Sequence, residues 1–222
     1  MGLHEQFKQD LISTGFFVAV PDNPHQLIYR VAAAASMQLD IIPFGDIEEP
    51  AARIAWPPDM NPVMNVAGFS EAAQAAVLIR IERDLVVPFA SLPSMAILKL
   101  LAWKDRHYES RRDATDFLIL LQTYARAGNE DRLYERERAL MERHDFDIDI
   151  AAAALLAKDT RAILSTETSG QIDALFADEA EYQLLLEHMA FGDRQAFRDG
   201  ELDPMRVQAR MEAYRQTFMH GE

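Results

Sequence analysis

The chain has 222 residues and contains no cysteine, which excludes disulfides and thiolate-bound zinc. Its formal net charge of −14 at pH 7 argues against broad, non-specific binding to nucleic acids. No run of about 18 apolar residues occurs, and the first residues lack the basic and apolar regions of a signal peptide. We therefore expect a cytoplasmic protein with no membrane-spanning segment.

The first ninety residues read as one short helix followed by strands. A helix is predicted over 3–13, where Leu3, Phe7 and Leu11 recur every four residues, and Gly15 ends it. Apolar and β-branched runs predict strands at 16–20, 27–33, 37–44, 52–56, 76–81 and 85–89. The short spacing between these runs favours antiparallel pairing over parallel pairing with crossover helices.

The rest of the chain reads as helical. Periodic apolar residues predict helices over 91–106, 111–128, 129–144, 148–164, 169–190 and 203–218. The sequence therefore predicts an α+β fold, with a sheet region at 1–90 and an all-α region at 91–222.

Asp40 lies in the middle of the otherwise apolar run MQLDIIPF. Alternation along a strand places it on one face with Gln38 and Ile42. A buried carboxylate at this position needs a cation, a metal or hydrogen-bond donors. The alternative is that this face of the strand is simply exposed to solvent.

Residues 94–121 carry a cluster of basic side chains on an acidic protein. The segment 99–112 contains five basic residues and only two acidic ones, Asp105 and Glu109. Lys99 is surrounded in sequence by apolar residues, so it either extends along its stem to water or points at a ligand phosphate. Arg106 follows seven residues later, on roughly the same helical stripe. A local positive patch is a candidate site for an anionic ligand such as a phosphate.

Three charged residues follow on the second predicted helix. Arg112 and Asp116 are four residues apart, and Asp113 and Asp116 are three apart, so all three are neighbours on a helix surface. They form either a solvated ion-pair face or, through Arg112 and Asp113, a bridge between two helices.

Two other groups of polar residues are candidates for metal or catalytic sites. Asp145, Asp147 and Asp149 alternate, which on a strand would suit a divalent cation, but a helix-forming run follows them. Helix capping is the favoured interpretation. The six histidines show no paired ligand spacing, and the sequence has no P-loop, G-x-G-x-x-G or nucleophile elbow.

Four blocks in a fixed order resemble a known family. They are LDIIPFGDIEEP (39–50), ARIAWPPDMNPVMNVAGFSEA (52–72), VPFASLPSMAILKLLAWKDR (87–106) and RRDATDFLILLQTYA (111–125). Over roughly residues 5–165 the chain resembles the AbiEii/AbiGii toxins, which belong to the DNA polymerase β-like nucleotidyltransferase superfamily. The resemblance implies a mixed sheet followed by helices, and transfer of a nucleotide from an NTP, with Mg²⁺, to an acceptor such as RNA. It also implies an antitoxin partner.

The resemblance also implies roles for individual residues. Asp40 matches a carboxylate of a later strand and would assist a metal ion or the acceptor hydroxyl. Lys99 matches a lysine motif, and Arg106, Asp113 and Asp116 match an R-x-x-x-K-D-x-x-D-like motif, in which Arg112 stands where lysine is usual. Lys99, Arg106 and Arg112 would contact the NTP phosphates, and Asp113 and Asp116 would position these bases.

The chain departs from the family pattern before Asp40, where it has neither the Gly-Ser turn nor the D-x-D strand. We therefore expect an N-terminally incomplete nucleotidyltransferase-like sheet, and little or no transfer, because two-metal catalysis needs more than one carboxylate. The alternative is a non-catalytic nucleotide- or protein-binding module that self-associates through an exposed sheet edge. A third interpretation is an acidic structural protein in which the charges at 99–116 are solvent-facing ion pairs.

Overall fold

The computed structural model describes residues 2–21, 23–31, 35–48, 52–56, 63–190 and 203–221. The chain divides into two compact units, Met1–Val66 and Ala67–Glu222. Among the described residues all strand pairs are antiparallel, and after Phe89 all the described elements are helical, so the predicted α+β fold is confirmed. The described strands form one three-stranded and two two-stranded sheets. The division into domains at 1–90 and 91–222 stays a prediction.

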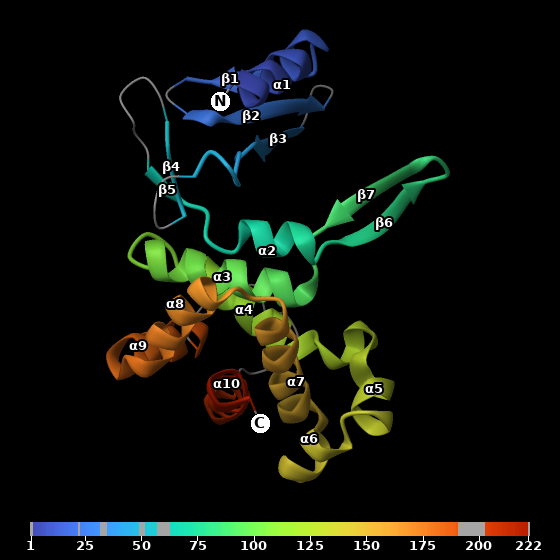
Figure 1. Cartoon of the computed structure of the whole chain (residues 1–222), viewed down its shortest axis with the longest axis vertical. Coiled ribbons are helices and arrows are strands. Elements are labelled where there is room, and N and C mark those ends of the chain that lie inside the picture. The colour runs from blue at the N-terminus through green and yellow to red at the C-terminus, as the bar shows by residue number, and fades with distance from the viewer. Residues whose placement is uncertain are drawn as a thin grey trace. The chain divides into compact units, whose positions relative to one another are not determined.

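The described residues of the first unit form one helix and five strands (Figure 1). Their bounds are α1 (Gly2–Ser13), β1 (Phe17–Val20), β2 (Asn23–Val31), β3 (Ala35–Asp40), β4 (Arg53–Ala55) and β5 (Val63–Asn65). The order in the larger sheet is β1-β2-β3, and β4 pairs with β5. Gly15, after α1, has a φ of +78°, a conformation that glycine adopts without steric cost.

The strand predicted over 37–44 is wrong in its second half, because β3 ends at Asp40. The amide of Ile41 still donates to the carbonyl of His25 at 2.7 Å, but Pro43 then has no N–H to continue a ladder. The end of the strand predicted over 27–33 lies outside the described residues. Pairing of Gln26 with Asp40 places Asp40 at the end of the β2–β3 ladder.

The second unit is mainly helical and includes one hairpin (Figure 1). Its elements are α2 (Phe69–Gln74), β6 (Val77–Glu82), β7 (Leu85–Phe89), α3 (Leu92–Arg106), α4 (Arg112–Thr123), a π-helical turn (Ala125–Asn129), α5 (Glu130–Glu135), α6 (Arg138–Arg143), α7 (Ile148–Ala162), α8 (Thr166–Ala177), α9 (Glu179–Ala190) and α10 (Pro204–His220). None of the described helices is both long and apolar enough to cross a membrane.

The core of this unit lies around α7. Every residue from 151 to 157 is buried, and five of these seven are alanine, so neighbouring helices approach α7 closely. From α3, α4 and α10 the fully buried Trp103, Phe117 and Tyr214 complete the core. Burying an aromatic side chain of this size contributes roughly 2–3 kcal/mol, and this fixes how α3 and α4 face each other.

Two long predicted helices are interrupted in the structure. The helix predicted over 169–190 breaks at Asp178, whose carboxylate accepts hydrogen bonds from the amides of Ala180 and Glu181 and so caps α9. The segment 129–144 forms the two short helices α5 and α6. The π-helical turn before them contains Gly128 with a φ of +95°.

Candidate functional site

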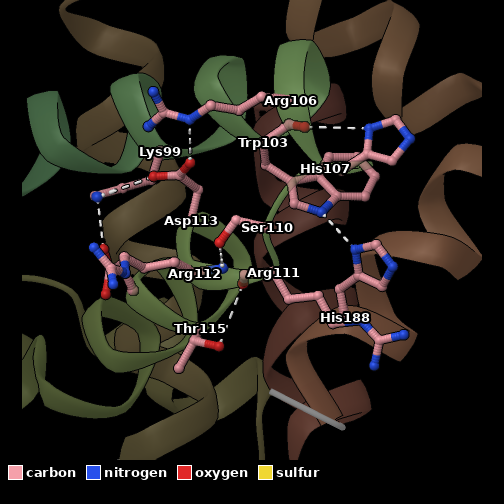
Figure 2. A network of polar contacts seen from close by, with 11 residues as sticks. Lys99, Trp103, Arg106, His107, Ser110, Arg111, Arg112, Asp113, Thr115 and His188 are labelled. Carbon is pink, nitrogen blue, oxygen red and sulfur yellow. Dashed lines mark hydrogen bonds and ion pairs between the residues drawn. The ribbon is translucent and has the colours of Figure 1, made fainter. Parts of the chain in front are cut away.

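Four charged side chains from α3 and α4 meet in one cluster, the α3–α4 quartet of Lys99, Arg106, Asp113 and Asp116 (Figure 2). Lys99 Nζ lies 3.1 Å from Asp113 Oδ1 and 2.6 Å from Asp116 Oδ2. Arg106 Nε donates to Asp113 Oδ2 at 2.8 Å. One carboxylate therefore holds both bases that the sequence singled out.

The local sequence explains this arrangement. Ser91 caps α3 by accepting a hydrogen bond from the amide of Ser94, which fixes where the helix begins. Lys99 and Arg106 are seven residues apart and so lie on the same side of α3. The short connection before α4 turns the chain back, and Asp113 and Asp116, three residues apart, face them.

Burial makes these contacts stronger than surface ion pairs. The side chain of Asp113 is 4% exposed, whereas that of Arg106 is 54% exposed. Burial opposes ionisation of Asp113, but hydrogen bonds from Arg106 and Lys99 outweigh it and hold the pKa of Asp113 below its usual value. Partial burial similarly opposes the charge on Lys99, yet hydrogen bonds to Asp116 and Asp113 raise its pKa. Lys99 and Asp113 therefore stabilise each other's charged forms.

The quartet leaves several hydrogen-bond donors unused. Lys99 has three N–H groups and uses two on aspartates, and Arg106 uses only Nε, so its four terminal N–H groups have no partner among the described residues. The side chain of Arg112 is exposed and makes no ion pair within the described part of the chain. The predicted Arg112–Asp116 pair and Arg112–Asp113 bridge are therefore wrong, since Lys99 and Arg106 take both aspartates.

Asp40 belongs to the first unit and is exposed at the end of β3. Its Oδ1 accepts hydrogen bonds from Gln26 Nε2 at 3.0 Å and from Gln38 Nε2 at 3.3 Å. Both of these hydrogen bonds come from neutral amides and reach the same carboxylate oxygen.

The described residues contain no cluster of carboxylates ready to hold the Mg²⁺ ions that nucleotidyl transfer uses. Among them no three or more His, Cys, Asp or Glu side chains are grouped to hold a metal ion. Two-metal transfer needs carboxylates on adjacent strands, and Asp40 supplies only one. The role of Asp40 as a metal ligand stays a prediction.

The three aspartates at 145–149 include a helix cap, as favoured from the sequence. Asp147 caps α7 by accepting from the amides of Asp149 and Ile150. Asp147 and Asp149 also form ion pairs with Arg206 of α10, and Asp149 forms another with Arg210. These carboxylates therefore join α7 to α10.

A second polar network joins Trp103 and His107 of the α3 region to His188 of α9, and no local sequence pattern predicts it. The indole of Trp103 donates to Nδ1 of His188 at 3.1 Å, and the ring of His107 stacks on Trp103 with centroids 4.9 Å apart (Figure 2). His188 is 85 residues away from Trp103 in sequence, so only the packing of α9 near α3 reveals the pair. The hydrogen bond requires an unprotonated Nδ1.

This network predicts a dependence of stability on pH. Burial, then the charge of Arg111 and the nearby His107, lower the pKa of His188, while Glu187 opposes them. Above the unfolded value of about 6.5 the imidazole is neutral in both states. Below it the unfolded chain takes up the proton first, so the free energy of unfolding falls as pH falls from 6.5 to the folded pKa, by about 1.4 kcal/mol for each unit of depression.

Urea unfolding of wild type and His188→Gln at pH 5, 6 and 7 measures this loss. Glutamine keeps an acceptor for Trp103 but does not titrate, so the difference in stability between the two proteins should shrink or reverse in favour of the variant as pH falls. A difference that stays constant from pH 7 to 5 would contradict the assignment.

Comparison with known families identifies the chain. The family model described as nucleotidyl transferase AbiEii toxin, type IV toxin–antitoxin system, matches residues 7–220, a longer span than the four sequence blocks cover. Comparisons with curated proteins and with solved structures gave no match. Because the family model covers nearly the whole sequence, the chain belongs to the AbiEii nucleotidyl transferase toxin family.

Proposed function

We propose that the α3–α4 quartet, together with Arg112, binds the phosphates of a nucleoside triphosphate. The observation that carries this proposal is that Asp113 holds Lys99 and Arg106 side by side while their outer donors stay unpaired among the described residues. Donors fixed in this way lose little conformational entropy when an anion binds. Family membership supports a nucleotide as the anion.

We also propose that this chain alone transfers little or no nucleotide. Transfer in this superfamily relies on an NTP and Mg²⁺, and among the described residues Asp40 belongs to no group of three or more His, Cys, Asp or Glu side chains that could hold a metal ion. The acceptor class, RNA, the antitoxin partner and the cytoplasmic location remain predictions of the same proposal.

Two measurements test the proposal. In thermal unfolding, ATP or GTP at about ten times its dissociation constant should stabilise the protein by about 1.4 kcal/mol, which for a chain of this size raises Tm by roughly 3–6 °C. Incubation with radiolabelled NTP, Mg²⁺ and total RNA should give no label above that of a heat-inactivated control. If neither ATP nor GTP raises Tm, the binding proposal is wrong. If the radiolabel is strongly incorporated, the proposal that the chain transfers little or no nucleotide is wrong.

A further inference from the structure

The hairpin formed by β6 and β7 exposes a large amount of apolar surface. Both strands lie in a sheet of two, and no third strand among the described residues pairs with them. Seven large apolar side chains are each between 42% and 74% exposed: Val77, Leu78, Ile79, Ile81, Leu85, Val86 and Phe89. In Figure 1 the hairpin extends away from the helices of its own unit. Two-stranded ribbons are marginally stable in water, and a contiguous exposed apolar patch marks an interaction site.

The two edges of this ribbon differ. Pro88 of β7 pairs with Leu78 of β6, and because proline has no N–H it leaves a gap in the donors of β7. Strand β6 contains neither proline nor lysine, the residues that commonly protect an edge. A register shift between Arg80 and Glu82 limits further pairing on β6 to the segment 77–81. Strand β6 is therefore the open edge.

Antiparallel pairing of this segment with itself gives a consistent register. A two-fold axis at Ile79 places Val77 opposite Ile81 of a second copy and Leu78 opposite Arg80 of that copy. Val77, Ile79 and Ile81 of both copies then share one face of a four-stranded sheet, because side chains alternate along a strand. No two like charges lie directly opposite each other in this register.

The self-complementary register selects a second copy of this chain as the occupant, and the charge of the hairpin permits it. The protein carries −14, so two copies repel over most of their surfaces. In the hairpin two arginines, Arg80 and Arg83, offset two acids, Glu82 and Asp84, and the segment 77–81 holds a single charge. It is a surface where two acidic copies meet with little repulsion.

We propose that the chain forms a two-fold dimer by antiparallel pairing of strand β6 with β6 of a second copy. Addition of a five-residue segment buries less than the roughly 800 Å² per partner of a standard interface. The dimer is therefore weak and depends on protein concentration.

Sedimentation equilibrium of the full chain at several concentrations tests this proposal. Wild type should show a reversible monomer–dimer equilibrium. Ile79→Lys places two ammonium groups next to each other at the axis and should weaken dimerisation at least tenfold. Leu85→Lys, on β7, introduces the same charge at a similarly exposed position opposite Glu82, where it creates no like-charge pair, and should leave the equilibrium within about twofold.

A purely monomeric wild type up to millimolar concentration overturns the proposal. Equal loss of dimer in Ile79→Lys and Leu85→Lys also overturns it, because the contact would then not run along β6. Circular dichroism of each variant checks that the fold is kept. Amide hydrogen exchange gives an independent readout, since the amides of β6 should exchange more slowly at high protein concentration than at low concentration if the edge is paired.

Discussion

Replacement of Asp113 by alanine is expected to lower the free energy of unfolding by about 2–3 kcal/mol. The change removes two charge-assisted hydrogen bonds, one from Lys99 and one from Arg106, each worth roughly 1.5–3 kcal/mol when made to a charged group. The loss stays below the 3–5 kcal/mol typical of a broken buried ion pair, because Lys99 keeps Asp116 and Arg106 is half exposed to water. For a chain of this length Tm should fall by roughly 8 °C.

Two matched variants and a change of pH check this expectation. Asp116→Ala removes a partly exposed partner of Lys99 and should lower the free energy of unfolding by about 1 kcal/mol. Glu109→Ala, in the exposed turn between the helices, should lower it by less than about 0.5 kcal/mol. The pKa of Asp113 lies below 3.8 in the folded state, so its contribution is present above 3.8 and is lost as pH falls through the folded pKa. Urea unfolding of wild type and Asp113→Ala should therefore differ less below pH 3.8. Equal stability of the two at pH 7 would show that the quartet does not hold α3 to α4.

The sequence predicted α3 and the β6–β7 hairpin well because their signals are local. Ser91 and Pro93 mark the start of α3, and the apolar period runs without interruption to Arg106. Strands β6 and β7 flank a two-residue turn, so their pairing needs no long-range information. By contrast, α2 is a helix of six residues that follows Gly68, where a side chain would lie 2.9 Å from Ile97 of α3. Packing against α3, not periodicity, defines it.

The sequence predicted which residues form the candidate site but not how they pair, because pairing depends on packing between helices. Its four residues were named from the sequence, but the spacing of Arg112 and Asp116 along one helix suggested a partner that the structure does not use. The relative rotation of α3 and α4 decides which base meets which acid, and it depends on buried residues such as Trp103 and Phe117. His188 joins Trp103 across 85 residues, a contact that no local pattern signals.

The pairing within the quartet sets how strongly an anion can be attracted. Two bases and two acids cancel, so the quartet offers positioned donors with no net charge. The attraction for a phosphate then depends on nearby unpaired bases, of which Arg112 is exposed and adjacent to Asp113 in sequence. At physiological ionic strength charges act over about 8 Å, so a base this close to the quartet still contributes.

Arg112→Glu is therefore expected to weaken ATP binding at least tenfold. The same change should alter the free energy of unfolding by less than about 0.5 kcal/mol, because the side chain has no ion pair in the described structure to lose. Isothermal titration at two salt concentrations measures the affinity, and wild type should be the more salt-sensitive of the two. Arg138→Glu, an equal change of charge at a side chain 74% exposed on α6, is the control and should bind ATP like wild type. Equal weakening in both variants would mean that net charge alone governs binding.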